Sequence, residues 1–401
     1  MRVALIIERT DITLGGAERS IAELSEALAL KGLDVTILAA KGEPDSANTQ
    51  ILCPDSGGKR ATFTEFETLL KGHLAQHDYD IVHSVLPFSF ADVYQPRGGT
   101  YRETVLRSAL SYENRSIAWL KRLGAFVNHR RQQFMMAERS LSKNAQGPKI
   151  VAISQYVVNQ FRTHYDTDPA RIVLIANGVK PGEPVDSRQR QRTRRDMLAQ
   201  FRCRPPDAML LLFAAYNFRL KGLGPLLHAL ALIKQTQPCC LSIVGKSHSA
   251  ETYEETAQRL NISNHVHFTG SVDRLHGLLA AADVAILPTF YDPASRFVLE
   301  ALSLAKPVIT TQYNGATDLF VHERHGFVIH DPEDVGALVH AIRSMSDPER
   351  LRKMSAAIAA DGITERVSIN RVAAQLIRLY ETILRQKGRE ACSLSAASAS
   401  R

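Results

Sequence analysis

Two acidic residues, Asp292 and Glu300, follow a buried-type apolar run, with seven residues between them. An ionised carboxylate only accepts hydrogen bonds, and it can take both hydroxyls of a vicinal diol. Two carboxylates therefore suit a ligand with a diol at each end, and a nucleotide sugar is a ligand of that kind. The alternative is structural: Glu300 favours the positive end of a helix, and Asp292 starts a turn.

Two cations, Arg219 and Lys221, lie in a predicted loop that leads into a helix beginning near Gly222. At that position they could clamp a diphosphate and stabilise negative charge on a leaving group. Ordinary surface charge is the alternative for two isolated basic residues.

The N-terminal half supplies further candidates. Gly15 and Gly16 lie between a buried-type strand and an amphipathic run, where backbone N–H groups can approach a phosphate at a helix start. A tight turn is the alternative. His83 ends a later predicted strand, although a histidine there is more often packed than catalytic. A loop containing Asp92 and Arg97 follows.

The sequence contains no convincing metal motif. Residues 78–80 and 166–168 have D-x-D spacing, but the first run leads into a buried-type strand and the second precedes Pro169. We therefore predict chemistry that needs neither a metal ion nor another cofactor.

The elements that must position these residues alternate between strands and helices, which is typical of a doubly wound parallel sheet. In such a sheet the loops after the strands line the crevice where ligands bind. The predicted strands are 3–7, 34–39, 80–85, 149–154, 172–177, 209–215, 241–245, 266–270, 284–288 and 307–311. The predicted fold class is α/β, with two Rossmann-like parallel-sheet domains facing a cleft.

At 401 residues the chain is long enough for two domains, each with its own core. Pro181–Asp186 is predicted to be a linker because Pro and Gly break regular structure. The predicted N-terminal domain covers 1–180 and the C-terminal domain covers 181–365. A last helix is predicted over 366–386, and a disordered tail rich in Ser and Ala over 387–401.

The composition, with 45% hydrophobic and 22% charged residues, is that of a soluble globular protein. Five cysteines without metal-ligand spacing fit a reducing cytoplasm. No run approaches the roughly 18 apolar residues of a membrane span, and the apolar core at the N-terminus is too short for a signal peptide.

The net charge of +8 is concentrated in two segments. Residues 97–143 hold ten Lys/Arg against three acids, and residues 188–204 hold seven Arg against one Asp. An anionic membrane surface would attract the first segment, at about 1 kcal/mol per nearby cation. A solvated cationic face is the alternative. Nucleic acid is not expected as a partner because no recognised binding module is present.

Several motifs resemble those of retaining GT-B glycosyltransferases of family 4. YDPASRFVLEAL, which starts at Tyr291, is similar to the E-x7-E region of that family in a variant that opens with Asp. GGAE at 15–18, NFRLKG at 217–222 and KPVIT at 306–310 also match. The triplet DVY at 92–94 resembles the lipopolysaccharide-core glucosyltransferases. This chain has Gly98 where those enzymes often have an Asp, so no carboxylate base is assigned in this loop.

The resemblance implies roles for the candidates, and it implies that the last helix crosses back onto the first domain. Asp292 would contact the transferred sugar and Glu300 the nucleotide ribose, while Lys221 and Arg219 would bind the diphosphate. We assign Asp292, Lys221 and Arg219 as catalytic. The remaining donor-binding candidates are Gly15, Gly16, Val272, Gly315 and Ala316, with Val272 near the nucleobase, and the acceptor-side candidates are His83, Asp92 and Arg97.

The expected protein is a metal-independent glycosyltransferase that moves a sugar from a UDP-sugar, with retention, to a hydroxyl of a cell-envelope glycan or glycolipid of the lipopolysaccharide-core kind. It would act in the cytoplasm, peripherally on the inner face of the plasma membrane through residues 97–143. A sugar epimerase on the same fold is one alternative. A non-catalytic, membrane-associated nucleotide-sugar-binding protein is the other.

Overall fold

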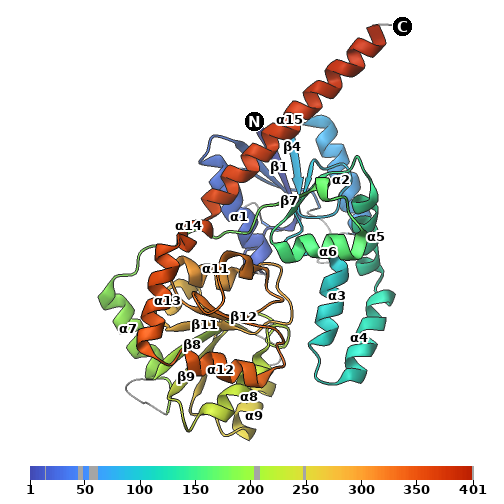
Figure 1. The fold of residues 1–401 in the computed structure, drawn as a ribbon. Coiled ribbons are helices and arrows are strands. Elements are labelled where there is room, and N and C mark those ends of the chain that lie inside the picture. Colours follow the sequence, from blue (N-terminus) through green and yellow to red (C-terminus); the bar gives the residue numbers. More distant parts are fainter. Residues whose placement is uncertain (14, 44–47, 54–61, 203–207, 247–249, 400–401) are drawn as a thin grey trace. The chain divides into compact units, whose positions relative to one another are not determined.

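The chain forms two compact units in a computed structural model (Figure 1). One unit combines Met1–Glu103, Leu123–Ala176 and Ile369–Arg401, and the other combines Thr104–Arg122 and Asn177–Ser368. The described residues are 1–13, 15–43, 48–53, 62–202, 208–246 and 250–399, with backbone alone for 123, 125–127 and 389–399.

A seven-stranded parallel sheet forms the centre of the first unit, in the order β3-β2-β1-β4-β5-β6-β7. The strands are β1 (Arg2–Arg9), β2 (Asp34–Lys41), β3 (Thr49–Ile51), β4 (Ile81–Ser84), β5 (Val93–Tyr94), β6 (Lys149–Ala152) and β7 (Ile172–Leu174).

Alternate side chains of β1 enter two different cores, which explains why this strand is apolar throughout. Val3, Leu5 and Ile7 pack with α1 (Gly16–Ala29) and α15 (Ile369–Ala399). Ala4 and Ile6 pack with α2 (Phe63–Gln76) on the other face. The other helices that begin or lie in this unit are α3 (Tyr101–Leu110), α5 (His129–Lys143), α6 (Gln155–Tyr165) and the 3-10 turn η1 (Pro169–Arg171), and α4 (Arg115–Val127) spans the division between the units.

The last helix, α15, belongs to the core of the first unit although it comes at the end of the chain. Val372, Leu376 and Tyr380 are fully buried there at the helical spacing that the sequence predicts. The backbone of α15 stays helical to Ala399, which differs from the predicted disordered tail. Residues 387–399 contain four alanines, which favour a helix, and no proline to interrupt one.

A six-stranded parallel sheet forms the second unit, in the order β10-β9-β8-β11-β12-β13. Its strands are β8 (Met209–Ala214), β9 (Cys239–Val244), β10 (Val266–Gly270), β11 (Val284–Leu287), β12 (Val308–Thr311) and β13 (Gly326–Ile329). Its helices are α7 (Ser187–Leu198), α8 (Leu223–Ile233), α9 (Ala250–Arg259), α10 (Leu275–Ala281), α11 (Arg296–Ser303), η2 (Gly315–Leu319), α12 (Val335–Ser344), α13 (Pro348–Ala360) and α14 (Ile363–Arg366).

The prediction of two Rossmann-like, doubly wound parallel sheets is therefore confirmed. Each sheet grows first to one side of its opening strand and then to the other. The reversal falls between β1 and β4 in the first sheet and between β8 and β11 in the second. The carboxyl ends of the strands on either side of such a reversal form the usual ligand crevice.

Candidate active site

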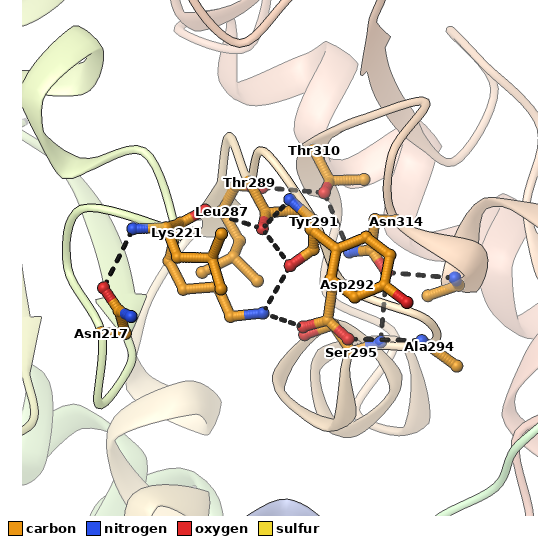
Figure 2. Close-up of polar contacts among 12 residues, drawn as sticks. Asn217, Lys221, Leu287, Thr289, Tyr291, Asp292, Ala294, Ser295, Thr310 and Asn314 are labelled. Carbon is orange, nitrogen blue, oxygen red and sulfur yellow. Dashed lines mark hydrogen bonds and ion pairs between the residues drawn. The ribbon is translucent and has the colours of Figure 1, made fainter. Parts of the chain in front are cut away.

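Lys221 and Asp292 form an ion pair at the reversal point of the second sheet, one after β8 and the other after β11 (Figure 2). Nζ of Lys221 lies 2.7 Å from Oδ2 of Asp292 and donates to the carbonyl oxygen of Tyr291 at 2.9 Å. Their side chains are 20% and 14% exposed, so the pair is shielded from bulk water yet open to a ligand.

The loop after β8 is shaped by its own backbone. Oδ1 of Asn217 accepts a hydrogen bond from the N–H of Leu220, and the N–H of Lys221 donates to the carbonyl of Asn217. Gly222 follows with φ of 80°, and a Cβ there would lie 1.9 Å from the carbonyl oxygen of Pro288. Only glycine satisfies both conditions. The close approach to the end of β11 is what lets Lys221 reach Asp292.

A fully buried amide, Asn314, fixes the other side of the pair. Its Oδ1 accepts from the N–H groups of Ser295 and Ala316, both at 3.1 Å. Its Nδ2 donates to Oγ1 of Thr310 at 2.9 Å (Figure 2). Sequence analysis gave Asn314 no role, although the residue belongs to a turn that resembles the NG of the family.

Backbone bonds complete the loop that carries Asp292. Its N–H donates to the carbonyl of Tyr313, and its carbonyl accepts from the N–H of Gly315, both at 2.9 Å. The N–H groups of Gly315 and Ala316, two of the donor-binding candidates, therefore already donate to acceptors within the protein. They shape the loop around Asp292 instead.

The second predicted acid, Glu300, lies on α11 and forms an ion pair with Arg296 one turn earlier, at 3.1 Å. Both side chains are mostly buried. Because α11 follows β11, Glu300 and Asp292 come from the same crossover at the carboxyl edge of the sheet. Their ion pairs are separate.

Arg219 lies in the same loop as Lys221 but makes different contacts. Its NH1 donates to the carbonyl of Ser108 at 2.9 Å and to the hydroxyl of Ser111, and its guanidinium stacks 3.5 Å from the ring centre of Tyr112. Burial lowers the pKa of Arg219, although an arginine stays charged at all relevant pH values. The structure thus places the two predicted cations in one loop with different partners.

Val272 is half-buried and follows β10, also at the carboxyl edge of the second sheet. Its predicted place near a nucleobase stays a prediction.

Comparison with known proteins identifies the family. Residues 14–183 match the description "Glycosyltransferase Family 4", and residues 200–361 match "Glycosyl transferases group 1". The lipopolysaccharide glucosyltransferase WaaG of Escherichia coli is 24% identical over 84% of this chain and 88% of its own length. The chain belongs to the family-4 glycosyltransferases of the GT-B fold.

Solved structures agree with the fold of this glycosyltransferase. A crystal structure of WaaG, described as involved in lipopolysaccharide biosynthesis, superposes with a TM-score of 0.76 at 21% identity, over 94% of this chain and 99% of that one. Anabaena HepE in complex with UDP-glucose gives 0.67 at 14% identity, over 95% and 100% of the two chains. The two family descriptions and the named relative WaaG, rather than the fold, favour the transferase over the predicted alternatives of an epimerase and a non-catalytic binding protein.

Gly15 and Gly16 lie at the start of α1, after β1 of the glycosyltransferase. Gly15 is the N-cap residue in extended backbone, which other residues also adopt, and Leu14 lies outside the described residues. The helix start carries the carboxylate of Glu18, which pairs with Arg9 at 3.3 Å. The predicted contact of the two glycines with a phosphate stays a prediction.

His83 of the glycosyltransferase is fully buried, which is the packed alternative that sequence analysis favoured. Its Nδ1 lies 2.6 Å from the hydroxyl of Tyr380 in α15. Burial, reinforced by the nearby charge of Arg97, lowers the pKa of His83 to about 3, so the ring is neutral at physiological pH. Arg97 is half-buried beyond β5, at the carboxyl edge of the first sheet, and its predicted place on the acceptor side stays a prediction.

Asp92 does not lie at that carboxyl edge, and its assignment to the acceptor side needs correction. It precedes β5, so it is at the amino end of the sheet. Its carboxylate accepts from the N–H of Val82 at 2.9 Å and pairs with Lys387 of α15 at 2.7 Å. The sequence analysis predicted a loop containing Asp92 and Arg97 and did not recognise the two-residue strand β5 between them.

The two D-x-D segments have structural roles. Asp80 accepts from the backbone N–H of Arg2. Asp166 caps α6 in the left-handed region, and Asp168 caps η1. In the described part of the chain, no three His, Cys, Asp or Glu side chains are grouped as metal ligands.

The corner after α3 leads into α4, whose described side chains are exposed for the most part. Trp119 and Leu120 are 62% and 60% exposed, and Lys121 and Arg122 beside them are also exposed. Among the described residues, no helix has both the length and the apolar character needed to cross a bilayer.

Proposed function

We propose that this glycosyltransferase uses a UDP-sugar and transfers the sugar, with retention at the anomeric carbon, to a hydroxyl of a cell-envelope glycolipid. The observation that carries the proposal is the Lys221–Asp292 pair at the reversal point of the second sheet. Doubly wound sheets bind nucleotides at such points. The structural likeness to a HepE complex that contains UDP-glucose supports the choice of donor.

Lys221 supplies charge for the leaving group. An ammonium has three N–H donors, and the contacts of Lys221 in the described residues are with Asp292 and Tyr291. The third donor is available for the β-phosphate. Negative charge on the diphosphate grows as its bond to the sugar breaks, and a fixed cation in a shielded site stabilises that charge most in the transition state.

Asp292 and Glu300 orient the donor. The carboxylate of Asp292, held by Lys221, accepts hydrogen bonds from hydroxyls of the transferred sugar, and Glu300 accepts them from the ribose. Asn314 keeps the loop of Asp292 in one conformation through its three hydrogen bonds. The donor is thus fixed at both ends before reaction.

The bond between the anomeric carbon and the phosphate oxygen breaks, and the acceptor oxygen bonds to the same face of the sugar. The acceptor proton passes to the leaving phosphate oxygen, so no carboxylate base is needed. Lys221 and Arg219 carry the charge for which other enzymes use a divalent cation. We expect the enzyme to turn over as fast in excess EDTA as it does with added Mg²⁺ or Mn²⁺. A tenfold lower turnover in EDTA would refute metal independence.

The acceptor is inferred from relatives. WaaG of Escherichia coli is named as a lipopolysaccharide glucosyltransferase, and LpsD of Rhizobium meliloti as a lipopolysaccharide core glycosyltransferase. A lipid-linked acceptor of the lipopolysaccharide-core kind fits a protein that docks on the cytoplasmic face of the plasma membrane. The exposed Trp119, Leu120, Lys121 and Arg122 offer apolar and cationic groups for that contact.

Trp119 is the single tryptophan of the chain, so its fluorescence reports directly on membrane docking. Vesicles with 30% phosphatidylglycerol should shift its emission to shorter wavelength, and vesicles of phosphatidylcholine alone should not. In the Lys121→Glu/Arg122→Glu double variant, anionic vesicles should shift the emission of Trp119 less than they do in wild type. An unchanged spectrum with anionic vesicles would refute docking through α4 without affecting the donor site.

Donor identity is tested by incubating the protein with UDP-, GDP- and ADP-glucose and a lipopolysaccharide-core acceptor, and by NMR of the product. We expect transfer from the UDP-sugar to a product whose anomeric proton is equatorial, with the same small coupling to H2 as in the donor. An altered free sugar without transfer would identify an epimerase. A product of opposite anomeric configuration would refute retention.

A further inference from the structure

Three residues at the end of α3 and in the corner between α3 and α4 contact the side chain of Arg219. Residues Thr104–Arg122 belong to the same compact unit as the second sheet, so these contacts lie within one unit. NH1 of Arg219 is bonded to the carbonyl of Ser108 and the hydroxyl of Ser111, and the guanidinium lies over the ring of Tyr112 at 3.5 Å. A long, flexible side chain is thereby kept in one orientation.

The partners that Arg219 contacts at this corner carry no formal charge. Its hydrogen bonds are to a carbonyl and to hydroxyls, it stacks on the phenol ring of Tyr112, and the phenol of Tyr253 also lies near its charge. Lys221, two residues along, is instead paired with the carboxylate of Asp292. The positive charge of Arg219 is therefore oriented without being neutralised, which is the state in which a cation binds an incoming anion most strongly.

A second contact ties the same corner to the other loop of the site. The guanidinium of Arg107 lies 3.6 Å from the ring centre of Tyr313. The carbonyl of Tyr313 accepts the N–H of Asp292. The end of α3 and the corner after it therefore contact both the loop that carries Lys221 and the loop that carries Asp292, although they are far from these loops in the sequence.

We propose that Tyr112, assisted by Ser111, is a positioning residue that presents the guanidinium of Arg219 to the diphosphate of the donor. The inference deepens the proposed function and rests on its claim that a nucleoside diphosphate binds beside Lys221. Stacking on Tyr112 fixes the plane of the guanidinium, and Ser111 and Ser108 fix its rotation. The conformational entropy that Arg219 would lose on binding is thus lost before the donor arrives.

The experiment measures binding of UDP and of uridine by calorimetry for wild type, Tyr112→Ala, Tyr112→Leu, Tyr112→Phe, Arg219→Ala and the Tyr112→Ala/Arg219→Ala double variant. Tyr112→Leu keeps bulk without an aromatic face, and it serves if Tyr112→Ala unfolds. Leu110→Ala is the matched control because Leu110 is exposed on the same corner.

We expect Tyr112→Ala, Tyr112→Leu and Arg219→Ala to weaken UDP binding by about 3- to 30-fold. Uridine, which lacks phosphates, should bind all variants equally. Tyr112→Phe keeps the ring and should stay within about twofold of wild type, as should Leu110→Ala. The double variant should bind UDP no more weakly than Arg219→Ala, because Tyr112 acts only through Arg219.

Two results would overturn the inference and leave the proposed function standing. In the first, wild type binds UDP and Arg219→Ala binds it more weakly, but Tyr112→Ala and Tyr112→Leu bind UDP as tightly as wild type. The other is a Tyr112→Ala effect that adds fully to that of Arg219→Ala or weakens uridine equally. Wild type that does not bind UDP would instead remove the proposed function and the inference with it.

Discussion

The ammonium of Lys221 lies 2.7 Å from the carboxylate of Asp292, although the two residues are 71 positions apart in the chain. The pair forms because Gly222 lets the loop after β8 press against the end of β11. Each partner keeps capacity for a ligand: Lys221 has one further donor, and the Asp292 carboxylate has further lone pairs. A paired cation and anion at one point can bind a phosphate and a sugar hydroxyl together.

Gly222→Ala should separate the pair and abolish most transfer. The substitution places a Cβ on the carbonyl of Pro288 and requires φ of 80° from an alanine, so we expect a loss of more than about 2 kcal/mol in the free energy of unfolding. Urea denaturation measures it.

Gly72→Ala is the matched control for that substitution. Gly72 lies inside α2, and a Cβ there would have no atom within 4 Å. This variant should gain about 0.5–1 kcal/mol, because alanine favours a helix. Equal effects of the two substitutions would show that the loop after β8 is not as tight as the structure indicates.

Asn314→Ala should lower both stability and kcat/KM. It leaves the N–H groups of Ser295 and Ala316 without their acceptor inside the protein, at a cost of about 2–4 kcal/mol. Gln312→Ala, two residues away and exposed, should stay within about 0.5 kcal/mol of wild type. If thermal and urea denaturation gave the two variants the same stability, the hydrogen bonds of Asn314 would not stabilise the loop of Asp292.

Glu138 of α5 should make the first unit less stable as pH rises. Its buried carboxyl accepts from the hydroxyls of Tyr94 and Tyr165 and from the N–H of Tyr101, at 2.7–2.8 Å. Burial raises its pKa to about 7, against 4.5 in the unfolded chain. Between these values the folded chain keeps a proton that the unfolded chain has released, so stability falls with rising pH.

Glu138→Gln, which is neutral at every pH, isolates that effect. The free energy of unfolding of wild type minus that of Glu138→Gln should fall by on the order of 3 kcal/mol from about pH 4.5 to about pH 7, and then level off. Urea denaturation across this range measures the difference. A flat difference would show that folding leaves the pKa of Glu138 unchanged, and a rising one would show that folding lowers it.

The sequence was sufficient for most of the strands, though not for β3, β5 and β13, and for two residues that meet at the end of a strand. Buried-type strands such as 3–7 and 284–288 have the apolar run that a parallel sheet requires, and Lys221 and Asp292 each follow one of them. Parallel strands place their following loops at one edge, so the meeting of these two residues could be foreseen.

What the sequence did not show depends on contacts between distant segments. Asp92 was predicted to lie in a loop after strand 80–85, because β5 has only two residues and was not recognised as a strand. Arg219 was expected beside Lys221, but its partners come from α3 and the corner after it, more than a hundred positions earlier. Asn314 looked like an ordinary turn residue, because its role depends on three partners that only the fold brings together.

Turnover by Lys221→Ala at saturating UDP-sugar and acceptor tests the central claim most directly. Removing a fixed cation from a shielded site where charge develops should lower kcat by about 100- to 1,000-fold, while Lys221→Arg, which keeps the charge, should lose less. A thermal melt confirms that each variant is folded. A folded Lys221→Ala protein with the kcat of wild type would contradict the account, because the leaving diphosphate would then draw its stabilisation from elsewhere.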